Sequence, residues 1–181
     1  MKGRRHILLI AAAAILSALA VASYRAAAQD IPPELGQGWA PEFALTSRQL
    51  LQLAEATPAE KYSWRPAPGV RSISEVYMHI AIANLWLLQQ AGAPSPELAK
   101  LPKDPEKSVT AKADVIKWLR TSQDAVRAAY PSADRQKKVQ FFNKDATADG
   151  VFLRILLHDN EHMGQSIAYA RMNGIVPPWS K

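Results

Sequence analysis

The order of apolar and polar side chains after residue 40 has the period of an α-helix. In the first such segment, from Pro41 to just before Pro58, apolar residues recur at helical spacing, and Phe43, Leu50, Leu51 and Leu53 form an apolar stripe. Such a stripe is stable in water only when it packs against a partner. The pattern therefore predicts the first helix of a helical assembly.

The second helix is predicted by its start as well as by its stripe. Ser72 and Glu75 have the spacing of a capping box, in which the hydroxyl and the carboxylate satisfy free amide groups of the first turn. The helix is expected to run to about Ala91, because Gly92 follows. The next connection, residues 92–107, contains four prolines and is long enough to cross the end of a bundle.

Two further helices follow. The third is expected to be capped by Ser108 or Thr110 and to end before Pro131, and the fourth to be capped by Thr147 and to run to about Asn173. The polar segment between them contains at most a short extended piece, with no convincing strand ladder. Four amphipathic segments of this kind predict an all-α four-helix bundle, with loops long enough for a non-uniform topology.

The first 28 residues have a different pattern, which predicts a signal peptide. A basic start that includes Arg4 and Arg5 precedes an apolar run of about 16 residues, and a membrane span requires roughly 20. We expect cleavage between Ala28 and Gln29 and export to the periplasm or beyond. The arginine pair resembles a twin-arginine signal, although an ordinary secretory signal or an uncleaved anchor is the alternative. The predicted organisation is a signal peptide at 1–28, an irregular lead-in at 29–40 and the bundle at 41–181.

The charge of the chain belongs largely to this leader. The whole sequence has a net charge of +6, but residues 1–28 carry four basic and no acidic residues, so the predicted mature chain has 18 basic and 16 acidic residues. No stripe of basic and aromatic residues remains, which argues against a nucleic-acid partner. The absence of cysteine excludes disulfides and a lipid-modified N-terminus.

All three histidines after the leader lie on apolar helical faces. His158 and His162 are one turn apart on the last helix, and His79 lies on the second helix. Three buried imidazoles would otherwise need a separate hydrogen-bond partner for each ring nitrogen, whereas one divalent metal ion satisfies three nitrogens at once. We therefore predict a metal site formed by these three residues. The same faces carry Val151, Ile155, Gln165, Tyr169 and Met172 on the last helix, and Val76, Ala83 and Trp86 on the second.

Other polar residues near the histidines are weaker candidates for chemistry. His158 to His162 match the H-x-x-E-H pattern of inverted zinc proteases, but such enzymes need a further acidic ligand and a substrate cleft. Glu161 is a candidate proton acceptor and is otherwise, like Asp159, an outer carboxylate. Gln165, Tyr169 and, more weakly, Asn84 are candidate contacts to the ligands or to a substrate.

Several of these motifs together resemble the DinB-like (DinB/YfiT) superfamily. The resemblance is carried by residues 64–66, 69–75 with His79, the H-x-x-x-H-x-G-Q block at 158–165 and residues 169–178. It implies a four-helix bundle in which His79, His158 and His162 bind a divalent metal, commonly zinc or nickel. Characterised relatives include transferases that use a low-molecular-weight thiol, and homodimers are common in the family.

Two classes of function remain open. The protein is either a metal-dependent enzyme acting on a small molecule, as a thiol transferase or a hydrolase, or a non-catalytic, stress-related metal-binding protein. Export weakens the thiol inference, because such thiols are mainly cytoplasmic. Arg65 and Arg71, near the start of the second helix, could bind an anionic substrate or simply hold loops in place.

Overall fold

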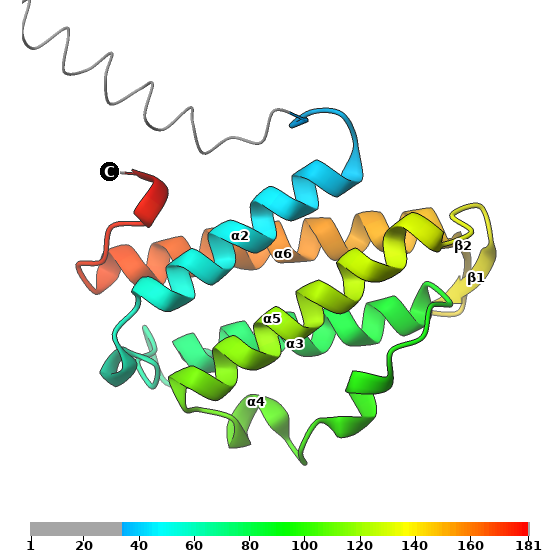
Figure 1. Cartoon of the computed structure of the whole chain (residues 1–181). Helices are drawn as coiled ribbons and strands as arrows, with labels where there is room; N and C mark the ends of the chain where they lie inside the picture. The colour runs from blue at the N-terminus through cyan, green and yellow to red at the C-terminus, as the bar shows by residue number, and fades with distance from the viewer. Residues whose placement is uncertain (1–33, 181) are drawn as a thin grey trace, which may run out of the picture.

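The computed structural model describes residues 34–180, so the predicted signal peptide lies outside the described residues. Within this range no helix is both long and apolar enough to cross a membrane. The predicted all-α four-helix bundle is confirmed (Figure 1). Its long helices are α2 (Trp39–Ala56), α3 (Ile73–Gln90), α5 (Lys112–Ala129) and α6 (Ala148–Met172).

The four helices do not follow a simple up-and-down order. Helices α2 and α3 each pack on both α5 and α6, so α2 and α3 lie at opposite corners of the bundle. Helices α3 and α5 run in the same direction, because the connection between them returns along the bundle (Figure 1). This proline-rich connection forms the short helix α4 (Pro105–Ser108) and the 3₁₀ turn Pro96–Lys100. The long loop therefore permits the non-uniform topology expected from its length.

Two of the predicted helix starts are confirmed, and a third is wrong. Ser72 forms the capping box with Glu75, and the Thr147 hydroxyl accepts a hydrogen bond from the Gly150 amide. Helix α5, however, begins after Ala111, with no side-chain cap. Ser108 instead ends α4, where its hydroxyl donates to a carbonyl of the preceding loop.

Other boundaries also differ from the prediction. Helix α2 begins at Trp39, two residues before the expected start. Met172 was predicted to face inward but is 64% exposed, because α6 has 25 residues against 18 in each of its partners. Its last turn therefore lies beyond the apolar interior.

The segment before α6 forms a β-hairpin rather than a single extended piece. Strand β1 (Lys138–Phe141) pairs antiparallel with β2 (Lys144–Thr147) through a two-residue turn. Both turn residues have positive φ, 50° at Phe142 and 59° at Asn143. Asparagine tolerates this conformation, but phenylalanine rarely adopts it. Because the turn is Phe-Asn rather than the usual Asn-Gly, the sequence contained no signal of a tight hairpin here.

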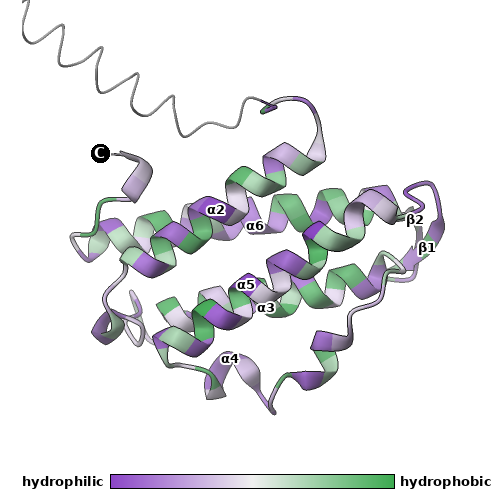
Figure 2. Ribbon diagram, viewed as in Figure 1, coloured by the Kyte–Doolittle hydropathy of each residue, from purple (hydrophilic) through white to green (hydrophobic). Residues whose placement is uncertain are grey.

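The bundle interior contains two apolar clusters, which draw on the apolar positions spaced along every helix (Figure 2). One cluster includes Leu50, Val76 and Leu119, and the other includes Phe43, Leu88 and Phe152. Between the two clusters in sequence, each long helix contributes a polar residue that has no exposed surface and leaves a side-chain polar atom without a partner in the described structure. We name this set the polar layer. Its members are Ser47, Asn84, Gln123 and Asp159.

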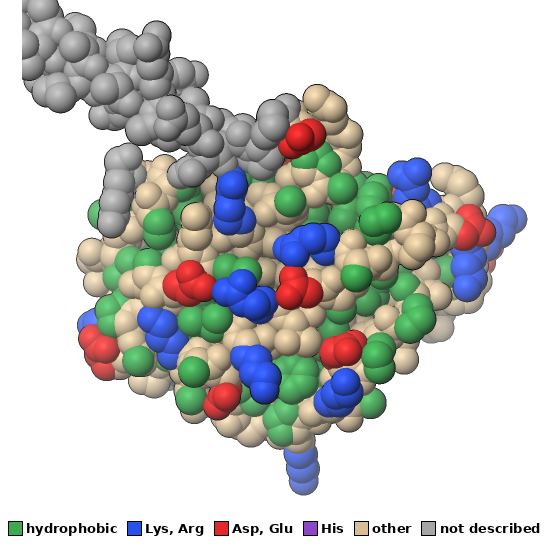
Figure 3. All heavy atoms as spheres, in the orientation of Figure 1, with side chains coloured by type: hydrophobic (Ala, Val, Ile, Leu, Met, Phe, Trp, Pro, Cys, Tyr) green, Lys and Arg blue, Asp and Glu red, His purple; other side chains and the backbone are tan. Residues whose placement is uncertain are grey.

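The outer surface over α2 and α5 mixes charges of both signs (Figure 3). Two exposed ion pairs lie there, Glu55–Arg120 at 2.9 Å and Asp124–Arg127 at 2.8 Å. No single-sign patch covers the described part of this face (Figure 3). This agrees with the small net charge predicted for the mature chain.

Candidate metal centre

Helices α3 and α6 pack together and bring the three predicted ligands into one cluster. Each of His79, His158 and His162 offers a ring nitrogen, and these nitrogens all lie within 4.8 Å of one another. The Nε2 atoms of His79 and His158 are 3.1 Å apart. His158 is 8% exposed, and the other two rings are partly buried. Residues that are 79 positions apart in sequence thus meet within the bundle.

The ring of His79 is oriented by a carboxylate. Its Nδ1 lies 2.9 Å from Oε1 of Glu106, whose other oxygen accepts a hydrogen bond from Arg71 at 2.9 Å. Since an ionised carboxylate can only accept, Nδ1 carries the proton and Nε2 keeps its lone pair, which faces the other histidines. Burial lowers the pKa of His79 despite the opposing hydrogen bond from Glu106, so neutral imidazole is favoured.

The ring of His162 is oriented by an amide in the same way. Its Nδ1 lies 2.8 Å from Oε1 of Gln165, and Nε2 of Gln165 donates to the Tyr169 hydroxyl at 3.0 Å. The amide oxygen accepts from Nδ1, which leaves Nε2 of His162 free to act as a ligand. The structure therefore places Gln165 and Tyr169, both candidates from the sequence, in a hydrogen-bonded chain behind this histidine.

His158 is the most enclosed ring of the cluster. Its Nδ1 is buried and has no hydrogen-bond partner among the described residues, while its Nε2 faces His79. Burial, together with the neighbouring His162 and His79, lowers the pKa of His158 to about 4. The ring is therefore neutral at pH 7, which is the form that binds metals.

This donor set fits a divalent metal ion. Two nitrogens that bind one tetrahedral ion at about 2.0–2.1 Å lie about 3.3 Å apart, close to the separation of the two Nε2 atoms. Without an ion or a shared proton, two lone pairs would face each other at 3.1 Å, which is unfavourable. The partners behind His79 and His162 are the acceptors that metal-bound imidazoles usually have.

The remaining candidates lie away from the ring nitrogens. Glu161 is on the exposed side of α6 and pairs with Arg154, with 3.3 Å between Oε2 and Nη2. Asp159 is fully buried and accepts a hydrogen bond from Asn84 at 3.3 Å, within the polar layer. The structure does not bring these three residues into the histidine cluster.

The two arginines near the start of α3 hold loops in place. Arg65 donates to the Val70 carbonyl and to Glu75, and Arg71 pairs with Glu106. Arg71 thereby supports the carboxylate that orients His79. Sequence reasoning missed Glu106, because it lies in the proline-rich connection at a separation of 27 residues from His79, where no spacing rule applies.

A pocket of about 370 Å³ opens directly on the cluster. Trp86, which the sequence places on the same helix face as His79, lines this pocket, whereas Tyr169 does not. The residues that line it are His79, Ile82, Ala83, Trp86, Leu87, Glu106, Phe141, Phe142, Arg154 and His158. Two of the three histidines are thus accessible to a small molecule that enters here.

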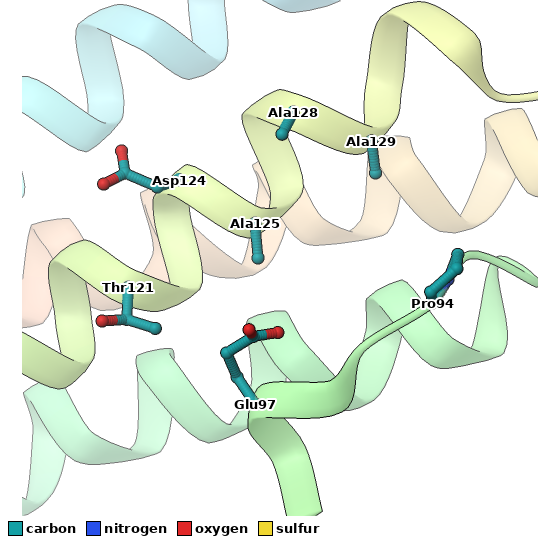
Figure 4. Close-up of a pocket in the computed structure, with 7 residues that line it drawn as sticks. All are labelled: Pro94, Glu97, Thr121, Asp124, Ala125, Ala128 and Ala129. Carbon is teal, nitrogen blue, oxygen red and sulfur yellow. The ribbon is translucent and has the colours of Figure 1, made fainter. Parts of the chain in front are cut away.

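A wider hollow of about 520 Å³ lies elsewhere, between α5 and the Pro96–Lys100 turn (Figure 4). Three of the seven residues that line it are alanines, and its acidic residues Asp124 and Glu97 are paired with Arg127 and Lys100. It contains none of the histidines. Of these two pockets, only the smaller one is lined by candidate metal ligands.

Comparisons with known proteins identify the fold and the family of the chain. The chain has the fold of a DinB-like protein from Bacillus cereus ATCC 10987, at a TM-score of 0.67 and 20% identity, covering 78% of this chain and 95% of the other. A DinB-like protein from Bacillus subtilis matches at a TM-score of 0.59 and 16% identity, covering 79% and 98%. No curated protein matches the sequence. The sequence model of the DinB superfamily matches residues 42–166, a span that contains all three histidines, and the chain therefore belongs to the DinB superfamily.

Proposed function

We propose that His79, His158 and His162 bind one divalent metal ion, zinc or nickel, and that the protein is a metal-dependent transferase or hydrolase acting on a small molecule. The observation that supports this most strongly is the 3.1 Å separation of the His79 and His158 Nε2 atoms. The opposite nitrogens of His79 and His162 are occupied by Glu106 and Gln165, so the free nitrogens point to a common centre.

Catalysis is favoured over a purely structural role by the access to this centre. Structural zinc sites are closed by four protein ligands, whereas catalytic sites keep a position open. Among the described residues the cluster offers three such ligands, and the pocket reaches two of them. A bound divalent ion would supply Lewis acidity, which makes a water or thiol a stronger nucleophile at neutral pH. Glu106 and Gln165 would hold the rings in the required orientation.

The metal content of the purified protein tests this proposal. We expect about one zinc or nickel ion per chain by elemental mass spectrometry, and its loss in the double variant His158→Ala/His162→Ala. The matched control is Glu161→Gln, which changes an exposed neighbour of His162 and should leave the content unchanged. A wild-type protein that stays empty after incubation with zinc, nickel and manganese would contradict the proposal.

Activity separates the enzyme from the alternative. A loaded protein that turns over neither thiol-transfer nor hydrolysis substrates would favour a non-catalytic, stress-related metal-binding protein. A reaction that requires the metal, and that the double histidine variant loses, would support the enzyme. Because characterised relatives of the resembled family use small thiols, thiol transfer is the first reaction to assay.

Export and dimerisation are separate parts of the proposal. The predicted signal peptide, residues 1–28, supports export, and an N-terminus at Gln29 in the protein recovered outside the cytoplasm would establish cleavage. Attachment to a membrane would then be limited to the uncleaved precursor. Homodimerisation is proposed from the family resemblance alone and is tested by light scattering of the purified protein.

A further inference from the structure

One wall of the 370 Å³ pocket is aromatic and is assembled from two distant parts of the chain. Trp86 comes from α3, whereas Phe141 and Phe142 come from the end of β1 and the hairpin turn. The Trp86 ring centroid lies 6.1 Å from that of Phe141 and 5.6 Å from that of Phe142, and the two phenylalanine rings are 4.5 Å apart. These three rings form a continuous surface beside His79 and His158.

Phe142 is unusual in both conformation and exposure. Its φ is 50°, in the left-handed region that a bulky side chain rarely adopts, and 71% of it is exposed. Glycine or asparagine would suit this turn position better, and an exposed ring adds little to the hairpin. The tight hairpin turn requires the positive φ, and bulky residues held in such conformations cluster at functional sites. Here the strained residue places its ring at the mouth of the pocket.

Arg154 supplies a cation at the same pocket. It lies one turn before His158 on α6, and its guanidinium pairs with Glu161 at 3.3 Å. This ion pair is weak, because the two side chains are 44% and 62% exposed. The guanidinium can therefore bind an anionic group of a ligand instead. The carboxylate of Glu106, which also lines the pocket, is already occupied by Arg71 and His79.

We propose that this pocket selects a small molecule with one aromatic ring and one anionic group. The ring packs against Trp86, Phe141 and Phe142, the anion binds Arg154, and the reacting group faces the histidine centre. The volume is near the lower limit of small-molecule pockets, which suits a ligand with a single ring. This assignment of the substrate class rests on the proposed function, since it places the ligand at the same centre.

The test uses sulfonates, which are poor metal ligands, as probes. Calorimetry compares 2-phenylethanesulfonate, butane-1-sulfonate and 2-phenylethylammonium on the purified protein. We expect 2-phenylethanesulfonate to bind about tenfold more tightly than the other two, because it alone satisfies both the rings and the arginine. Equal binding of all three probes would overturn the proposal.

Two variants assign the preference to the named residues. Phe142→Gly should reduce the preference for the phenyl over the butyl sulfonate without lowering the melting temperature, because glycine relieves the positive φ, and Phe142→Tyr should retain the full preference. Arg154→Gln should weaken both sulfonates about tenfold and leave the ring preference intact, and Arg154→Lys should restore part of the loss. A preference that Phe142→Gly leaves undiminished would contradict the proposal.

Metal content measured on the same samples keeps this test separate from that of the proposed function. If the protein contains metal and binds the probes without preference, only the substrate class is wrong. If the protein is empty but shows the preference, the metal proposal fails and the aromatic pocket stands. A doubling of the mass in solution that Phe142→Gly abolishes would assign the exposed ring to an interface between two copies and overturn its role in the pocket.

Discussion

Two groups of polar side chains interrupt the apolar interior of this bundle, and neighbouring residues of α6 contribute to both. His158 belongs to the histidine cluster, and Asp159 belongs to the polar layer. The cluster opens on a pocket, and two of its rings have hydrogen-bond partners behind them. The polar layer has no exposed surface, and each of its members leaves at least one polar atom without a partner in the described structure.

The difference shows that access and supporting partners, rather than polarity alone, distinguish a ligand site. Successive helical residues are rotated by about 100°, so His158 reaches the pocket while Asp159 points into the interior. Burial raises the pKa of Asp159 to about 8, against an opposing effect of its hydrogen bond with Asn84. The carboxyl is therefore neutral at pH 7, and it stabilises the bundle less than an apolar residue of similar shape would.

The largest expected effect is the stabilisation by zinc, which should depend on the histidine cluster and not on the polar layer. At a zinc concentration of about 1,000 times the dissociation constant, the free energy of unfolding should rise by about 4 kcal/mol, because the folded state alone holds the three histidines together. Denaturant titration should show this gain in the wild type and in Asp159→Asn. It should be absent from His158→Ala/His162→Ala, and a gain in that variant would place the metal elsewhere.

The second prediction concerns the pH dependence of the polar layer. The carboxyl of Asp159 ionises near pH 4 in the unfolded chain and near pH 8 in the folded protein, so stability is lost as pH rises through this window. The variant Asp159→Asn removes this loss. In metal-free protein we expect a gain of about 3 kcal/mol at pH 6 and almost none at pH 4.

The shape of the pH profile checks the origin of that gain. His158 acts in the opposite sense, because its lowered pKa makes stability fall as pH drops from 6.5 to about 4. The Asp159→Asn profile should therefore rise up to pH 6.5 and then stay level. A variant that is less stable than wild type at every pH would mean that the carboxylate is ionised and paired in the folded protein.

The third prediction tests the support behind His79. Glu106→Gln keeps an acceptor but loses the negative charge that holds the ring and pairs with Arg71. Metal affinity, measured by competition with a chromophoric chelator, should fall by 10- to 100-fold. The matched control Glu97→Gln alters a carboxylate of the distant hollow and should leave the affinity unchanged. An unchanged affinity in Glu106→Gln would show that the ring is held by packing alone.

The smallest expected effect is a gain in the free energy of unfolding when Gln123, a member of the polar layer, is replaced. Neither side-chain polar atom of Gln123 has a hydrogen-bond partner in the described structure, although the residue is fully buried. Gln123→Met keeps the shape and removes two unsatisfied groups, so the free energy of unfolding should rise by about 1 kcal/mol in denaturant titrations. A loss of similar size would indicate that an internal water molecule satisfies the amide.

Prediction from the sequence succeeded where a feature is local. The Ser72–Glu75 capping box, the Thr147 cap and the common face of His158 and His162 depend on spacings within one helix, which follow from helical geometry. Prediction failed for the start of α5, because Ser108 is the last residue of the short helix α4 and its hydroxyl donates to the Lys103 carbonyl. Local preference does not reveal which of several neighbouring turns will form.

The amino-acid sequence alone determined the four helices and the helix faces that carry the three histidines, because helix formation and the facing of side chains depend on spacings within a single helix. The family resemblance that it carries was confirmed. Only the tertiary structure decided that Glu106 would orient His79 and that Phe142 would be held in a strained turn over the pocket. These contacts join residues from different elements, and their positions follow from how the helices and loops pack rather than from any spacing along the chain.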